Sequence, residues 1–272
     1  MFVTRLISGI VLVLIEIVTL YFSKIPLAAF LLFISIVGYL EITKTMQIRK
    51  NEEKINALEI IGLIGVTAYY VVMYFTGFTS YLLLVGVATF LIVMSAYVFG
   101  FPKFHASQVA TAIFAFVYAP VFLSFIYATR ELEFGIYIVW LILICSWGCD
   151  TCAYCVGVLF GKHKMAPVLS PKKSIEGAVG GVVGAAGLGA LFGWFVNGKV
   201  ESGVNFIILF AIISAAGALI SMVGDLAASA IKRNFDVKDY GKLIPGHGGV
   251  MDRFDSVIFA APVIYFLAKM LI

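Results

Sequence analysis

Two stretches in the second half of the chain combine positive charge with residues that favour helix starts or tight turns. The first stretch is Ser170-Pro171-Lys172-Lys173-Ser174, which leads into an apolar segment. Serine followed by proline predicts a helix start, with Ser170 as the N-cap and Pro171 as the first helical residue. Lys172 and Lys173 would then oppose the helix dipole. The helix N-terminus and the two lysine side chains would all attract a bound anion, so the pattern predicts a phosphate site. The alternative is that these lysines only set membrane topology.

The second stretch is residues 232–254, here called the charged segment, which mixes basic residues and carboxylates with a turn at Pro245-Gly246-His247-Gly248-Gly249. Glycines allow a backbone to approach a ligand closely. Asp252 and Asp255 are three residues apart, so both can face one point at the start of a helix. Aspartate at a helix start is ordinarily a cap, which is the alternative for one of the two. Together with Asp225 they suggest a hard divalent cation held by oxygen ligands.

Polar residues also recur at helical spacing inside two apolar segments. The first set is Ser146, Asp150, Tyr154 and Gly157, and the second is Ser214, Gly217, Ser221, Asp225, Ser229 and Lys232. Acidic residues inside apolar spans are rare and costly. The two faces predict a pair of helices that line one polar cavity open to the cytoplasm. Hydrogen bonds between helices and small-residue packing are the alternative explanation for the serines.

Three further features favour a structural interpretation. Glu16 has no polar companion on its helical face, so we expect a local structural partner or an interfacial position for it. The cysteines at 145, 149, 152 and 155 lie along one apolar helix, where four metal ligands cannot easily converge. They resemble small buried packing residues more than a metal site. The glycine-rich segment 175–197 predicts close helix packing, which would hold the helices beside the cavity in register.

The composition indicates that membrane-spanning helices position these residues. Of the 272 residues, 62% are hydrophobic and 12% are charged, and the mean hydropathy is +1.07. Soluble domains are roughly one quarter charged, so the bilayer is the natural solvent of this chain. Apolar segments occur at 5–22, 26–43, 58–76, 81–100, 107–128, 134–160, 175–197, 204–231 and 255–271. Because lipid cannot satisfy backbone polar groups, each should be a helix. The sequence predicts an all-α polytopic membrane protein with about nine transmembrane helices.

Basic residues predict the orientation of these spans, because cytoplasmic loops are enriched in lysine and arginine. With a cytoplasmic N-terminus, only Lys24, Arg130, Lys199 and Lys269 of the 19 basic residues fall outside. We therefore expect residues 1–130 to form about five spans without a recognised motif. Residues 131–272 would form a catalytic region of about four spans, with cytoplasmic loops at 161–174 and 232–254. Self-association through small-residue steps is left open, and no nucleic-acid partner is expected.

The second half of the chain resembles the phosphatidate cytidylyltransferases, also called CDP-diacylglycerol synthases. The residues that match their C-terminal signature are Ser229, Ile231, Lys232, Arg233, Lys238, Asp239, Gly241, Ile244, Pro245, His247, Gly248, Gly249, Val250, Asp252, Arg253, Phe254 and Asp255. An upstream half-motif is matched by Asp150-Thr151, Ala153-Tyr154, residues 161–164 and residues 170–177. The resemblance covers about residues 148–256, and the earlier spans agree in general hydropathy only.

The resemblance implies a Mg²⁺-dependent reaction in which CTP and phosphatidate give CDP-diacylglycerol and pyrophosphate. It further implies an enzyme of the inner (cytoplasmic) membrane with its active site facing the cytoplasm. The implied metal ligands are Asp225 and Asp252, with Asp255 as a further ligand and Asp150 completing the cavity or selecting a second, monovalent cation. The implied substrate contacts are Ser170, Lys172, Lys173, Ser229, Lys232, Arg233, Lys238, Gly248, Gly249 and Arg253. His247 would donate a hydrogen bond to a phosphate oxygen.

Two other functions are compatible with parts of the sequence. An ion-coupled transporter could use Asp150, Glu176 and Asp225 as an intramembrane proton or ion relay. That function would leave the charged segment without a role, and the sequence contains no inverted repeat. A CTP-dependent lipid kinase would share the nucleotide and differ in its product.

Overall fold

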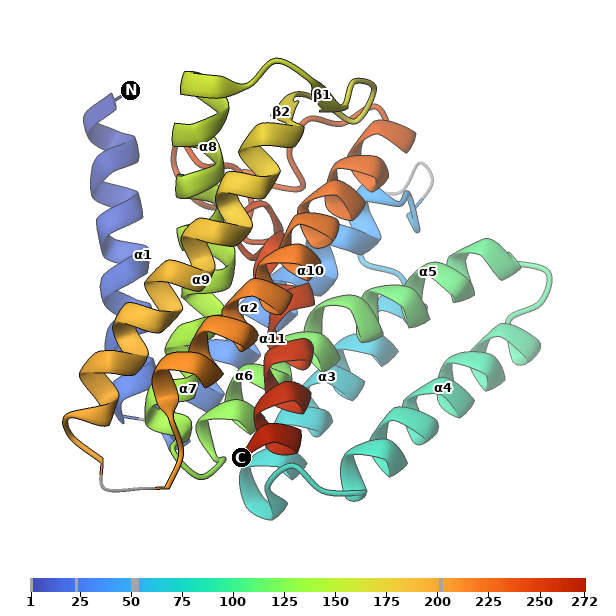
Figure 1. The fold of residues 1–272 in the computed structure, drawn as a ribbon. Helices are drawn as coiled ribbons and strands as arrows, with labels where there is room; N and C mark the ends of the chain where they lie inside the picture. The colour runs from blue at the N-terminus through green and yellow to red at the C-terminus, as the bar shows by residue number, and fades with distance from the viewer. Residues whose placement is uncertain (1, 23, 50–53, 201–202) are drawn as a thin grey trace. The chain divides into compact units, whose positions relative to one another are not determined.

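All nine apolar segments are helical in the computed structural model, which describes residues 2–22, 24–49, 54–200 and 203–272 (Figure 1). The first part of the chain forms α1 (Phe2–Phe22), α2 (Lys24–Thr45), α3 (Ala57–Thr76), α4 (Tyr81–Phe99) and α5 (Ala106–Phe116). A π-helical turn, η1 (Val117–Val121), joins α5 to α6 (Phe122–Arg130). Pro120 lies inside that turn, and its missing N–H explains why the regular helical ladder is interrupted there.

The second part of the chain continues with α7 (Gly135–Leu143), the π-helical turn η2 (Ile144–Gly148) and α8 (Cys149–Phe160). The strands β1 (Lys164–Ala166) and β2 (Ser170–Ser174) follow, and then α9 (Ile175–Asn197), α10 (Phe206–Asn234) and α11 (Met251–Leu271). Among the described residues, eight helical runs are long and apolar enough to cross a membrane, and Leu6–Phe22 is a shorter apolar helix. The expected all-α, multi-pass membrane protein is confirmed, whereas the side on which each terminus lies stays a prediction.

The backbone divides into two compact units. Unit 1 comprises residues 1–128 and 234–253, and unit 2 comprises residues 129–233 and 254–272. The first boundary between the units, at residues 128 and 129, lies close to residue 130, where the part without a recognised motif was expected to end. Most of the charged segment, however, packs in one unit with residues 1–128, which carry no recognised motif.

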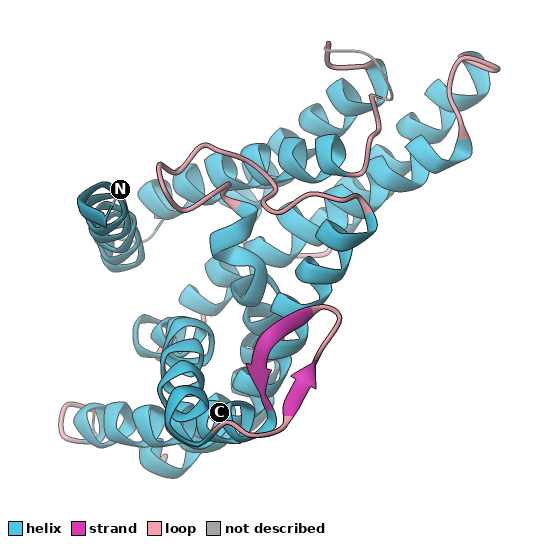
Figure 2. Cartoon of the chain, turned by 90° about the horizontal axis from the view of Figure 1, so that it is seen from above, coloured by secondary structure: helices cyan, strands magenta, loops and turns pink. Residues whose placement is uncertain are grey.

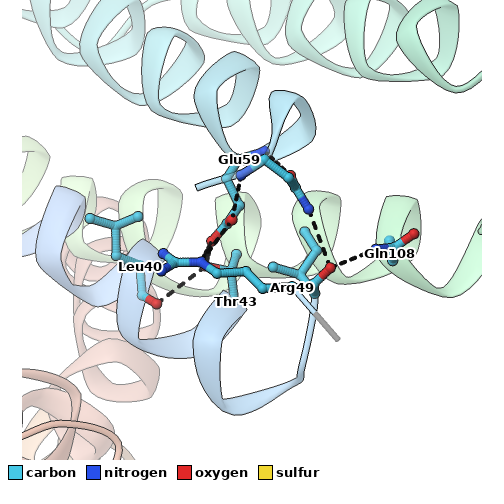
Figure 3. A network of polar contacts seen from close by, with 7 residues as sticks. Leu40, Thr43, Arg49, Glu59 and Gln108 are labelled. Carbon is cyan, nitrogen blue, oxygen red and sulfur yellow. Dashed lines mark hydrogen bonds and ion pairs between the residues drawn. The ribbon is translucent and has the colours of Figure 1, made fainter. Parts of the chain in front are cut away.

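A buried polar network closes the α2, α3 and α5 helices of unit 1 against one another (Figure 3). Glu59, whose side chain is fully buried, accepts hydrogen bonds from Arg49 Nε and Thr43 Oγ1 at 2.8–3.0 Å. Asn56 caps α3 by accepting from the Glu59 N–H, and the Glu59 carboxylate accepts from the Asn56 N–H in return. Gln108 of α5 donates to the Ile48 carbonyl at 2.6 Å. Arg49 therefore has a structural role in addition to its charge.

In unit 2 the glycines of α9 allow close contact with two neighbouring helices (Figure 1). A Cβ at Gly181 would lie 2.9 Å from the Cys149 Sγ of α8, and a Cβ at Gly193 would overlap the Phe206 carbonyl oxygen of α10. Cys149 belongs to the small buried cluster that also contains Ala185, Ala218 and Met222. The expected tight packing of α9 is confirmed, and the glycines that provide it are used within one chain.

The start of α9 differs from the expectation. Residues 170–174 form strand β2, which pairs antiparallel with β1, so that Ser170 lies opposite Ala166 and Ser174 opposite Lys164 (Figure 2). Ser174 is the N-cap of α9, and its Oγ accepts the Gly177 N–H at 3.1 Å. The prediction of Ser170 as N-cap is therefore wrong, because β1 pairs with this stretch and a second serine caps the helix four residues later. Lys172 lies in the strand, not in a first helical turn.

Candidate active site

A cavity of about 520 Å³ opens in unit 2 where α8, the β1–β2 hairpin, the start of α9 and the second half of α10 meet. Its lining comprises Asp150, Ala153, Tyr154, Gly157, Val158, Lys164, Met165, Lys172, Lys173, Ser174, Gly177, Ala178, Met222 and Asp225. Elements separated by up to 75 positions in the sequence therefore contribute to one hollow. The prediction that two polar helix faces line a common cavity is confirmed in part: Asp150, Tyr154 and Gly157 contribute from the first face, and Asp225 contributes from the second.

Three ammonium groups and two carboxylates face this cavity. Lys173 Nζ forms an ion pair with Asp225 Oδ2, and both side chains are about one quarter exposed. Lys164 and Lys172 are exposed at the rim, whereas Asp150 is half-buried. Such a set can bind a phosphorylated ligand, because the lysines attract phosphate oxygens and the carboxylates can hold a cation. The hairpin brings Lys172 and Lys173 to the cavity in place of the expected helical turn.

The polar faces of α8 and α10 contribute less to the cavity than the spacing indicated. Ser146 is buried and donates to the Ile142 carbonyl at 2.8 Å, so it belongs to the helix interior. On α10 only Asp225 of the six spaced residues lines the cavity. The hydroxyls of Ser214 and Ser221 are buried without a hydrogen-bond partner in the described structure. Gly217 packs against Cys145, so this part of the face serves helix packing.

Glu176, one of the acids inside an apolar segment, holds the hairpin. Its carboxylate accepts the backbone N–H groups of Lys162 and His163 at 3.1–3.2 Å, and it pairs with His163 Nδ1 at 2.6 Å. Glu176 lies outside the cavity lining. These contacts account for the carboxylate as an anchor of the chain between α8 and β1.

Asp255 lies beside the α10 helix at a point of close approach. A Cβ at Gly224 would be 2.7 Å from the Asp255 carbonyl oxygen, so Gly224 allows α10 and α11 to touch immediately before Asp225. The Asp255 side chain is 9% exposed, and its Oδ1 accepts the Ser256 N–H at 2.8 Å. Packing therefore brings Asp255 to the helix that carries Asp225.

Within unit 1, Asp252 organises the end of the charged segment. Its Oδ2 accepts the N–H groups of Tyr240 at 2.8 Å and Gly249 at 3.0 Å, and the residue is 8% exposed. Gly246 and Gly248 have φ values of 79° and 89°, a backbone region that glycine adopts readily. The expected glycine turn is confirmed. The two N–H groups that Asp252 accepts both precede α11, so these contacts hold the charged segment and are not those of a helix cap.

His247 projects from this turn toward α1. Ser8 Oγ donates to the Pro245 carbonyl at 3.0 Å and lies 2.9 Å from His247 Nδ1. A hydroxyl has one proton, and a carbonyl can only accept. Both contacts are therefore satisfied together when His247 Nδ1 carries a proton and donates to Ser8. In that arrangement Nε2 can donate to a phosphate oxygen only when the imidazole is fully protonated.

Glu41, a carboxylate near the C-terminal end of α2, was not predicted as a functional residue from the sequence. Its Oε1 accepts the Val250 N–H at 3.1 Å, and its Oε2 accepts the Met251 N–H at 2.8 Å. The only available signal was an acid inside an apolar segment, because its partners are backbone groups. For Glu16 two alternatives were expected. A local partner is not found, because the side chain is buried and neither carboxylate oxygen has a hydrogen-bond partner among the described residues, whereas an interfacial position stays a prediction.

The remaining expected site residues lie at varied depths. Lys238 and Arg233 are exposed, whereas Ser229, Lys232 and Arg253 are half-buried. Ser170 lies in β2 outside the cavity lining.

The described residues contain no group of three or more His, Cys, Asp or Glu side chains placed to hold a metal ion. The four cysteines range from buried to exposed and are free thiols. Asp225 and Asp252 belong to different units, and a metal shared by them stays a prediction.

A family model described as the cytidylyltransferase family matches residues 3–271. This chain belongs to the cytidylyltransferase family. The match extends over nearly the whole chain, whereas the motifs recognised in the sequence begin only near residue 148. The N-terminal helices therefore belong to the family together with the charged segment and the cavity.

Named relatives of this cytidylyltransferase-family chain come from several bacteria. A phosphatidate cytidylyltransferase of Thermotoga maritima is 38% identical over 163 residues, which are 60% of this chain and 60% of that protein. One of Staphylococcus epidermidis is 34% identical over 221 residues, 80% of this chain and 82% of that protein. One of Haemophilus influenzae is 43% identical over 134 residues, 49% of this chain and 46% of that protein.

Proposed function

We propose that this protein is a phosphatidate cytidylyltransferase, which converts CTP and phosphatidate into CDP-diacylglycerol and pyrophosphate, and that the unit 2 cavity is part of its active site. Membership of the cytidylyltransferase family supports the reaction. The observation that carries the assignment of the site is the Lys173–Asp225 pair, which lies beside Lys172 and Asp150 in one cavity.

The reaction requires no protein nucleophile. A phosphate oxygen of phosphatidate forms a bond to the α-phosphorus of CTP, and the bond from that phosphorus to the oxygen bridging to the β-phosphorus breaks. Pyrophosphate leaves with the bonding electrons. Both reactants are anions that repel each other, so the protein has to hold them in line and neutralise the charge that develops. A cavity with lysines on one wall and carboxylates on another suits this task.

The lysines of the hairpin would bind phosphate oxygens of the two substrates. Lys164 and Lys172 stand at the exposed rim, where an incoming triphosphate is met first, and Lys173 lies deeper against Asp225. Lys173 would exchange Asp225 for a phosphate oxygen when a substrate is bound. The apolar residues Val158, Met165 and Met222 line the same cavity and suit a lipid substrate.

The donor set fits a magnesium ion. Mg²⁺ commonly takes one or two protein carboxylates and leaves its other positions to water and substrate phosphates. Asp150 and Asp225 provide two carboxylates at one cavity. Bound there, Mg²⁺ would neutralise charge on the triphosphate. In this proposal Asp252 and Asp255 remain further candidate ligands, and a second, monovalent cation remains an expectation.

We place the active site on the cytoplasmic side of the inner membrane. The support is the distribution of basic residues, because the hairpin and the charged segment fall on the side that holds fifteen of the 19 lysines and arginines in the nine-span arrangement. CTP is a cytoplasmic metabolite, whereas phosphatidate resides in the bilayer. A cavity at a membrane surface is open to both.

The transporter alternative is weakened by the contacts of Glu176. A relay through Asp150, Glu176 and Asp225 needs a carboxylate that can exchange its partners. Glu176 instead accepts two backbone N–H groups and pairs with His163. The lipid kinase alternative keeps the same nucleotide and lipid, and it is separated from our proposal by the group that is transferred.

The experiment that tests the proposal measures which phosphorus atom of CTP is transferred to the lipid. Purified protein in detergent receives Mg²⁺, phosphatidate and CTP labelled either at the α- or at the γ-phosphorus. Cytidylyl transfer puts the α-label into the lipid and the γ-label into pyrophosphate. Label from the γ-position in the lipid would instead identify a kinase, and no label in the lipid from either position would refute both activities.

A further inference from the structure

The α2 helix, which carries none of the motifs recognised in the sequence, contributes a buried carboxylate to the charged segment. Glu41 is 8% exposed and lies more than 200 positions before its partners in the sequence. Its two oxygens accept the N–H groups of Val250 and Met251, where α11 begins. The first N–H groups of a helix have no partner within the helix, and a negative charge there is favoured by the helix dipole. Glu41 therefore caps α11 from another helix.

The charged segment is shaped to receive this carboxylate. A Cβ at Gly241 or at Gly249 would overlap Glu41 Oε1. Any other residue at these two positions would displace either the carboxylate or the backbone. Two glycines on separate stretches of the segment thus border one side chain of α2. The Glu41 side chain therefore requires glycine at both positions, whether or not a ligand requires it too.

Glu41 and Asp252 hold the same turn from two directions. Asp252 accepts the N–H groups of Tyr240 and Gly249, and Glu41 accepts those of the next two residues, Val250 and Met251. Three consecutive backbone N–H groups are thereby bound to carboxylates. This arrangement fixes the backbone that immediately precedes Asp252, next to the turn that carries His247.

We propose that Glu41 is a positioning residue for the transferase reaction: by binding the Val250 and Met251 N–H groups, its carboxylate fixes the backbone that carries His247, Asp252 and Arg253. The inference rests on the proposed function for its catalytic consequence, and on the hydrogen bonds alone for its structural one. It gives the N-terminal helices a task in the reaction, although none of their side chains needs to touch a substrate.

The test compares Glu41→Gln with Glu59→Gln in the full chain. Glutamine at 41 keeps the size of the side chain but turns an N–H₂ donor toward one of the two N–H groups. We expect amide hydrogen exchange in residues 240–251 to accelerate at least tenfold, and kcat/KM for CTP to fall roughly tenfold or more, as for loss of hydrogen bonds to a charged group. Glu59 is also buried in the same unit, but its partners are Arg49, Thr43 and Asn56. Its variant should lower the melting temperature and leave kcat/KM for CTP within twofold.

A second variant, Gly241→Ala, approaches the same contact from the charged segment. It should reproduce both defects of Glu41→Gln, and the double variant should be little worse than either single variant because both changes act through one carboxylate. Wild-type exchange and kinetics in Glu41→Gln would overturn the proposal. An equal kinetic loss in Glu59→Gln would also overturn it, since the effect would then be general destabilisation. If the wild-type protein transferred no cytidylyl group, the proposed function would fail, while the exchange measurement would still decide the role of Glu41.

Discussion

Lys173 and Asp225 illustrate how single residues at this site combine structure and chemistry. Their ion pair joins strand β2 to helix α10 across the cavity. The pair is partly exposed, so solvent screens it and it contributes little to stability. In the function that we propose, the two charges hold each other in place until a substrate offers phosphate oxygens to the lysine.

At the residue scale we predict that the hairpin lysines are needed for binding phosphate. Lys172→Gln and Lys173→Gln should each reduce kcat/KM for CTP about tenfold or more, because a charge-assisted hydrogen bond is worth about 1.5–3 kcal/mol. Steady-state kinetics of the purified variants measure this. Lys162→Gln is the matched control, since Lys162 is exposed just before the same hairpin but lies outside the cavity lining. Equal kinetics for all three variants would return the lysines to a purely topological role.

At the scale of elements, α9 acts as a spacer between the two helices that carry the cavity carboxylates. Its glycines bring α8 close on one side and α10 close on the other. Small residues serve this purpose in membranes because dispersion contacts and hydrogen bonds, not the hydrophobic effect, drive helix association there. The separation of Asp150 from Asp225 therefore depends on side chains that α9 lacks.

The packing of α9 predicts that two glycine-to-alanine substitutions in this helix differ in their effect on thermal stability. In Gly193→Ala the new Cβ would overlap a backbone oxygen of α10, which cannot rotate away, so we expect a destabilisation of about 1–3 kcal/mol. In Gly187→Ala the Cβ would meet nothing within 4 Å. Thermal unfolding in detergent should show a lower melting temperature for Gly193→Ala only. A similar melting temperature for both variants would contradict this account of the helix contacts.

Helices and strands differed in how well the sequence predicted them. Long apolar runs define spans because the bilayer leaves the backbone no other structure, and the bounds of α2, α9 and α10 follow from their runs. Strand β2 was missed because Ser170-Pro171 and Ser174 are both plausible helix starts, and the pairing with β1 decides between them. Glu41 was missed because its partners are backbone N–H groups, which are present in every sequence.

At the scale of the whole molecule, the charge distribution predicts how the chain crosses the membrane. Helix α9 has 23 residues, which is about 35 Å at 1.5 Å per residue and enough to span the bilayer. In a cysteine-free background, a cysteine at Lys162 should react with a membrane-impermeant reagent only from the cytoplasm, and one at Gly198 only from outside. Both positions are exposed. Labelling of both from the same side would contradict the nine-span arrangement.

The most direct test of the active site is transfer of the α-label from CTP to phosphatidate by Asp225→Asn. Asparagine keeps the size and hydrogen-bonding capacity of the side chain but removes the charge that pairs with Lys173 and would hold the cation. We predict that Asp225→Asn retains the wild-type melting temperature within a few degrees and loses label transfer by at least a hundredfold. Glu133→Gln, which also replaces a carboxylate by its amide but at an exposed residue of the same unit, should keep wild-type transfer. Near-wild-type, Mg²⁺-dependent transfer by Asp225→Asn would contradict the placement of the active site at this cavity.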